Sequence, residues 1–136
     1  MIRSLAMKSR WMCLWLFSMA LPALAHHSFD AEYDGNKTIV LTGVVTKVEW
    51  MNPHARFYVD VKENDGSVTN WNLELGSPAS LIRRGWTRKS LKAGDQITVK
   101  ASLAKDGSKM ANARSVTLAD GKSVFGASSA DKSSEP

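Results

Sequence analysis

The run Thr38–Trp50 (TIVLTGVVTKVEW) constrains the fold of this chain more than any other segment. It is rich in β-branched residues, which favour strands, and it is about twice as long as an average strand. Its apolar side chains alternate as far as Gly43 and then continue on the opposite parity. We predict one long strand with a β-bulge at Gly43, because one extra residue re-aims every later side chain. The apolar residues are Ile39 and Leu41 before the shift, and Val44, Val48 and Trp50 after it.

Later segments of the chain also alternate apolar and polar residues, and turn sequences separate them. Asn64-Asp65-Gly66, for example, is a hairpin signal between two such segments. The alternation places Trp71 on the buried face of its strand. We expect strands at residues 55–62, 70–75, 97–103 and 111–118, and a short additional strand at Ser123–Phe125.

A short helix is predicted at Pro78–Arg84, between the third and fourth strands. Ser77 can cap its N-terminus, proline suits the first helical position, and Gly85 can end it. We expect Leu81 and Ile82 to face the core. Three strands, a helix and two strands follow the order of an OB-fold, whereas an immunoglobulin-like sandwich needs about seven strands. The predicted fold class is therefore mainly β: an OB-like, five-stranded, partly open barrel with one short helix between strands 3 and 4.

The N-terminus resembles a secretory signal peptide. Residues 1–10 are basic, residues 11–21 form an apolar run, and Ala23-Leu24-Ala25 provides an A-x-A cleavage site. The apolar run is too short to span a membrane comfortably. We therefore expect cleavage after Ala25, a periplasmic or secreted location, an OB-like domain at residues 26–125 and a disordered tail at residues 126–136.

Cleavage changes the composition on which functional inferences depend. The leader carries three basic residues and no acidic one, so its removal lowers the net charge from +5 to +2. That balance argues against a nucleic-acid partner. The only cysteine, Cys13, leaves with the leader, so the mature domain must be held together by packing rather than disulfides.

The three histidines of the chain suggest a metal site. Cleavage after Ala25 would leave His26 with a free α-amino group beside two imidazoles. Antiparallel pairing of the second and third strands would bring His54 close to Leu75 or Glu74. Imidazole and amine ligands favour Cu(II), with Zn(II) and Ni(II) behind it. The candidate divalent metal ligands are His26, His27, His54 and Glu74.

Two other interpretations of the histidines stay open at this point. His27 alone could bind copper through the terminal amine, a deprotonated amide and its imidazole. Alternatively, the histidine pair is solvated and His54 caps a turn, in which case the chain needs no cofactor.

The outer face of strands 2 and 3 is a candidate ligand face, because OB-folds usually bind ligands there. The polar residues predicted to point outward on this face are Arg56, Tyr58, Asn70 and Asn72.

A basic segment supplies an alternative function. Arginine beside tryptophan can grip phosphate while stacking, so the segment could bind an anionic glycan, a lipid head group or another polyanion of the envelope. The competing interpretation is a solvated helix end, where cations are favoured by the helix dipole. The residues are Arg83, Arg84, Trp86, Arg88, Lys89 and Lys92.

Enzymatic activity is the least expected class of function. The chain has no G-x-S-x-G elbow, no H-E-x-x-H motif and no phosphate-binding loop. A copper-dependent oxidase is the enzymatic alternative, and a small barrel offers little platform for its substrate.

Several short motifs resemble an uncharacterised family of small exported bacterial proteins, classed as a domain of unknown function. The resemblance runs from about His26 to Val124 and implies export and a β-rich fold, without an activity. The motifs are His26-His27-Ser28-Phe29, Trp50-x-Asn52-Pro53-His54, Leu73-Glu74, Gly85-Trp86-Thr87 and Lys92-x-Gly94-Asp95.

We predict that the exported protein begins at His26. Intact-mass measurement of protein recovered from the periplasm should give the mass of residues 26–136. A mass that retains residues 1–25, or a start later than His27, would remove both the predicted cleavage and the terminal amine as a metal ligand.

Overall fold

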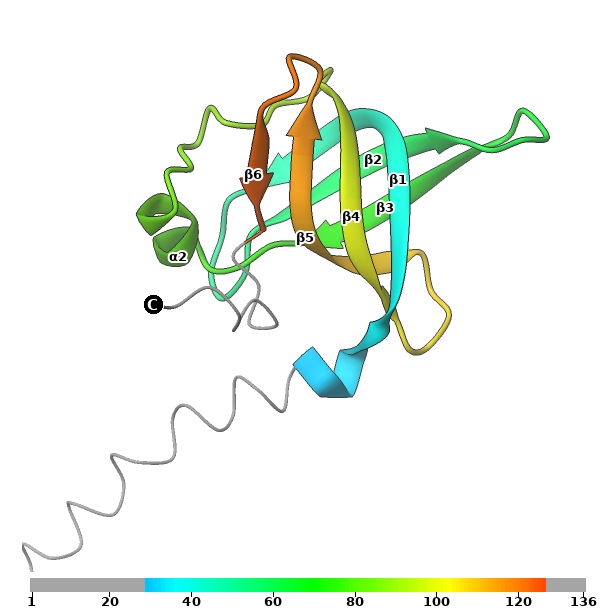
Figure 1. The fold of residues 1–136 in the computed structure, drawn as a ribbon, viewed down its shortest axis with the longest axis horizontal. Helices are drawn as coiled ribbons and strands as arrows, with labels where there is room; N and C mark the ends of the chain where they lie inside the picture. The colour runs from blue at the N-terminus through cyan, green and yellow to red at the C-terminus, as the bar shows by residue number, and fades with distance from the viewer. Residues whose placement is uncertain (1–28, 127–136) are drawn as a thin grey trace, which may run out of the picture.

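A computed structural model describes residues 29–126 of the chain (Figure 1). Within this range, no helix is long and apolar enough to cross a membrane. A helical turn at residues 29–32 leads into the first strand. The elements that follow are β1 (Tyr33–Glu49), β2 (Arg56–Lys62), β3 (Val68–Glu74), α2 (Pro78–Arg83), β4 (Gln96–Ala104), β5 (Met110–Leu118) and β6 (Ser123–Phe125).

The strands form one sheet that closes into a barrel. Its order is β3-β2-β1-β4-β5-β6, and a parallel pairing of β3 with β5 joins the two sides. That closing ladder is short and runs from Asn72↔Met110 to Glu74↔Asn112. A five-stranded barrel with α2 between β3 and β4 is the OB-fold topology. The predicted fold class is confirmed, and β6 adds the expected short strand beside β5.

The first strand is longer than predicted and pairs with two neighbours. It begins at Tyr33 rather than Thr38. Its first half pairs with β4 as far as Val44↔Gln96, and its second half pairs with β2 from Val44↔Asp60 onward. One strand therefore belongs to both halves of the barrel, which explains its unusual length.

The predicted position of the β-bulge is wrong. The pairing of β1 with β4 shifts between Tyr33 and Thr38 and is regular from Thr38 through Gly43, and the pairing with β2 shifts between Val45 and Lys47. Val45 is therefore buried, whereas Val44 is exposed. Gly43 has a different role, because a Cβ atom there would lie 2.2 Å from the carbonyl oxygen of Asp60. The glycine lets β2 cross close to β1.

Helix α2 covers the barrel with one side. The Ser77 hydroxyl accepts a 3.2 Å hydrogen bond from the backbone N–H of Ser80, and Gly85 takes a positive φ of 89° after the helix. Both predicted end signals are confirmed. Leu81 is fully buried, but Ile82 is 59% exposed, so its predicted inward orientation is wrong. Adjacent residues of a helix point about 100° apart, so a helix that packs on one side buries Leu81 and leaves Ile82 exposed.

The core lies inside the barrel and under α2. Trp71 is buried, as predicted from the alternation of its strand. The largest fully buried apolar side chains, apart from Leu81, are Tyr33, Phe57, Leu73, Leu75, Val45, Val59, Val99 and Val116.

The domain continues one residue beyond its predicted end. Gly126, expected to begin the tail, is buried and donates a 2.7 Å hydrogen bond to the carbonyl of Arg114. Its own carbonyl accepts a 2.8 Å hydrogen bond from the N–H of Gly76. These bonds attach the end of β6 to both β5 and the segment after β3.

We predict that Gly43→Ala destabilises the domain by about 2–3 kcal/mol, because the added methyl group forces β1 and β2 apart. Gly35→Ala on the same strand is the matched control, since its Cβ would meet nothing nearer than 3.6 Å. Urea unfolding measures both changes. Equal effects of the two substitutions would show that the close approach at Gly43 does not matter.

Candidate functional site: a buried glutamate that holds His54

Three elements bring polar side chains to the end of β3. Arg56 on β2 is the cross-strand partner of Glu74, and Asn112 on β5 is its partner on the other side. His54 lies in the loop just before β2, two residues from Arg56. The predicted proximity is confirmed, because the Nδ1 atom of His54 lies 3.1 Å from Oε1 of Glu74.

Glu74 accepts hydrogen bonds on both carboxylate oxygens. Oε1 accepts from His54 and, at 3.4 Å, from the Asn112 amide. Oε2 accepts from Arg56 at 2.5 Å and from the Tyr33 hydroxyl at 3.1 Å. Four donors thus replace the water that a buried carboxylate loses.

Glu74 is buried, although the alternation of β3 puts it on the same side as the outward-pointing Asn70 and Asn72. The residue is only 5% exposed. Tyr33, itself buried, comes from the start of β1 and contacts the carboxylate. The ring of Phe29 lies 5.7 Å from the Tyr33 ring and adds a further layer. Sequence analysis missed Tyr33 because its predicted first strand began later.

The charges of this cluster are mutually stabilised. Burial raises the pKa of Glu74, but the hydrogen bond and charge of His54, together with the charge of Arg56, outweigh burial and hold that pKa below its ordinary value. The hydrogen bond to Glu74 raises the pKa of His54. Burial and the charge of Glu74 strongly raise the pKa of Tyr33, so its hydroxyl remains a donor. Glu74 is therefore ionised at neutral pH.

The imidazole of His54 is held on one side and open on the other. Its Nδ1 atom is engaged by Glu74, and 37% of the side chain is exposed. Nε2 is therefore the ring nitrogen available to a ligand. A histidine fixed by a carboxylate at one nitrogen is the usual arrangement of a metal-binding imidazole.

The structure tests only part of the predicted ligand set. Within residues 29–126, no three histidine, cysteine or acidic side chains are grouped to hold a metal ion. His26 and His27 lie outside the described residues. Of the four candidate ligands, His54 and Glu74 are the two that the described part of the chain brings together.

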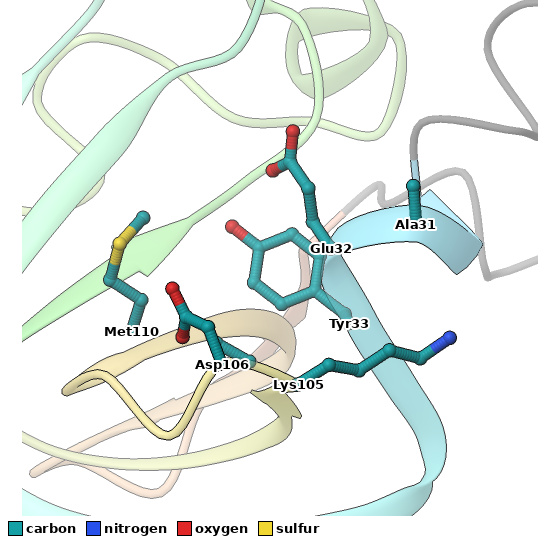
Figure 2. Close-up of a pocket in the computed structure, with 7 residues that line it drawn as sticks. Ala31, Glu32, Tyr33, Lys105, Asp106 and Met110 are labelled. Carbon is teal, nitrogen blue, oxygen red and sulfur yellow. The ribbon is translucent and has the colours of Figure 1, made fainter.

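A pocket of about 530 Å³ lies next to this cluster and shares Tyr33 with it. The carboxylates of Glu32 and Asp106 lie on either side of the Tyr33 ring, and the Lys105 side chain extends away from it (Figure 2). The Lys105 ammonium instead donates to the backbone carbonyl of Asp30. The negative charge of Glu32 also raises the pKa of His54. The residues lining the pocket are Ala31, Glu32, Tyr33, Ala104, Lys105, Asp106 and Met110.

The candidate ligand face of β2 and β3 is a network of paired polar groups. Arg56 donates to the Asn72 side chain at 3.3 Å, and the Tyr58 hydroxyl donates to Glu49 at 3.1 Å. Asn70 donates to Asp60 at 2.7 Å. The predicted outward orientation of the four polar residues agrees with their register and exposure.

The basic segment after α2 differs from its prediction in one respect. Trp86 is 3% exposed and packs in the core, so it cannot stack on a ligand. The chain turns back after α2, where the backbone N–H of Trp86 donates a 3.0 Å hydrogen bond to the carbonyl of the buried Leu81. Lys92 pairs with Asp95. The remaining cations, all exposed, are Arg83, Arg84, Arg88 and Lys89.

The chain matches the model of the Family of unknown function (DUF6152) over residues 14–113. It belongs to this family. The match begins within the apolar run of the predicted leader and ends in β5, whereas the motif resemblance ran from about His26 to Val124. The comparison with curated proteins found no match.

One solved structure similar to this chain is the mitochondrial single-stranded DNA binding protein Rim1 from S. cerevisiae. The two chains are 10% identical, and the similarity covers 61% of this chain and 93% of that one with a TM-score of 0.49. A similarity at this level says nothing about what the present chain binds.

We predict a stability maximum between the pKa values of Glu74 and His54. Stability from protonated His54 is present below its unfolded pKa of about 6.5 and is lost as pH rises through its raised folded pKa. Stability from Glu74 is present above its unfolded pKa of about 4.5 and is lost as pH falls through its depressed folded pKa. Urea unfolding in a chelator, at pH values on both sides of this window, measures the profile.

Two variants separate the contributions of Glu74 and His54 to the pH dependence of stability. Glu74→Gln should cost about 2–3 kcal/mol within the window, less than a fully buried ion pair because His54 and Arg56 are partly exposed. His54→Gln should remove the loss of stability above neutral pH and keep the loss in acid. A Glu74→Gln protein with the wild-type pH profile would contradict this account.

Proposed function

We propose that the mature protein is an exported, non-enzymatic binding module that binds a divalent metal ion, Cu(II) in preference, through His54 and its N-terminal histidines. The observation that carries the proposal is the hydrogen bond from His54 Nδ1 to Glu74, 3.1 Å long, which fixes the ring and leaves Nε2 for a ligand. Copper also suits the combination of imidazole with a terminal amine.

Glu74 has a supporting role in this proposal. Its two oxygens already accept four hydrogen bonds, so a metal ion would have to break one of them to bind there. An ionised carboxylate behind the imidazole instead orients the ring and increases its basicity. Glu74 is accordingly assigned to positioning His54, and the direct ligands are the histidines.

The position of the N-terminal segment supports participation of His26 and His27. Phe29 packs on Tyr33, whose hydroxyl contacts the same carboxylate as His54. His27 precedes Phe29 by two residues, a span of at most about 7 Å for an extended chain. The described chain therefore begins two residues after His27, at a side chain that packs on a donor to Glu74.

Export is supported by the leader pattern of residues 1–25. In this proposal, removal of the leader creates one of the metal ligands, because only cleavage after Ala25 makes the nitrogen of His26 a free amine.

Calorimetric titration of the mature, tag-free protein with Cu(II) tests the proposal. The wild-type chain should bind one ion, and the affinity should fall as pH drops through the pKa of His54, which the hydrogen bond to Glu74 raises above the ordinary imidazole value, because the ligands must be deprotonated. His54→Ala should weaken binding at least tenfold. Glu74→Gln should weaken it by about 10–100-fold through loss of the positioning carboxylate.

Acetylation of the α-amino group of His26 should weaken binding as strongly as His54→Ala, because it removes the terminal amine as a ligand. Lys62→Ala, at the exposed end of β2, is the control and should bind like the wild type. If His54→Ala binds as tightly as the wild type, copper is held by the terminus alone and the shared site is wrong.

A further inference from the structure

Helix α2 ends with an apolar side chain exposed among cations. Ile82 is 59% exposed, although its neighbour Leu81 is completely buried. The residues that follow, Arg83 and Arg84, are also exposed, and so are Arg88 and Lys89 in the next loop. We refer to these five exposed residues as the Ile82–Lys89 surface.

The Ile82–Lys89 surface carries an excess of positive charge. The sequence contains no acidic residue between Glu74 and Asp95. Among residues 29–126, no carboxylate pairs with the four cations of this surface. Asp95, the first acid after this surface along the chain, pairs with Lys92, and Asp120 lines the same pocket as Lys89 and Asp95. The four cations outnumber these acids, so a partner of negative charge would be attracted to this surface.

The surface is also accessible. Helix α2 and the loop after it lie on one flank of the barrel, on the side opposite the projecting tip of the β2–β3 hairpin (Figure 1). A flat partner can approach this flank without meeting the hairpin.

The exposed Ile82 indicates which kind of negatively charged partner fits this surface, a soluble polyanion or an anionic membrane. A soluble polyanion would use the arginines and gain nothing from Ile82, and a solvated helix end would explain the cations alone. A bilayer of anionic phospholipid uses both, because head groups attract the cations and the interface takes up the apolar side chain. We propose that the Ile82–Lys89 surface docks the mature domain peripherally on anionic phospholipid membranes.

Co-sedimentation with vesicles tests this proposal. The mature, tag-free protein should sediment with vesicles of equal parts phosphatidylcholine and phosphatidylglycerol, and not with phosphatidylcholine alone. Binding should fall with added salt as the charges are screened. Arg83→Gln/Arg84→Gln should reduce the partition coefficient about 25-fold, roughly fivefold for each cation removed. Ile82→Ser should reduce it about tenfold at constant charge.

Matched controls carry the same substitutions elsewhere on the barrel. Val40→Ser changes an apolar side chain that is 64% exposed on β1. Lys62→Gln/Lys100→Gln removes two exposed cations from β2 and β4. Both controls should sediment like the wild type. If Ile82→Ser sediments like the wild type, the membrane proposal is wrong. It is also wrong, and the surface is a polyanion site, if dextran sulfate binds the wild type and Ile82→Ser equally well and displaces both from vesicles.

Discussion

The burial of Glu74 is the constraint on which this structure depends most. The barrel closes through a short parallel ladder between β3 and β5, and Glu74 is the last residue of β3 in that ladder. A carboxylate in such a place is stable only when donors replace its lost hydration. The donors come from the start of β1, the loop before β2, β2 itself and β5. One side chain thus fixes parts of the chain that are far apart in sequence.

The same interaction connects the fold to the proposed metal site. Because Glu74 occupies Nδ1, His54 presents Nε2. Because Tyr33 contacts Glu74 and Phe29 packs on Tyr33, the described chain begins beside the carboxylate that holds His54. The same hydrogen bonds of Glu74 therefore stabilise the fold and, in the proposal, position His54. A substitution at Glu74 or at His54 would therefore change both stability and metal affinity.

Local patterns were sufficient for much of the fold. Alternation identified the strands and the burial of Trp71, and the end signals of α2 were correct because they depend on neighbouring residues alone. Antiparallel pairing was enough to bring His54 to Glu74. These features need no knowledge of which distant segment covers which face.

The predictions were wrong where contacts between segments far apart in the sequence decide the position of a residue. A change of parity shows that a bulge exists, but Gly43 is required by the backbone of β2 rather than by the bulge. Glu74 is buried by Tyr33, which lies 41 residues away in the sequence. Trp86 was predicted to stack on a ligand beside arginines, yet it packs in the core. The type of a side chain does not by itself show whether distant segments bury it.

Paramagnetic broadening by Cu(II) in the amide NMR spectrum tests the central claim most directly. With a small fraction of one equivalent of copper, broadening should be strongest for His54 and Ala55 and extend to Tyr33 and Asn112, while Gly66 at the hairpin tip stays sharp. Glu74→Gln should reduce this broadening at His54. Broadening confined to residues before Phe29, with His54 unaffected, would contradict the account.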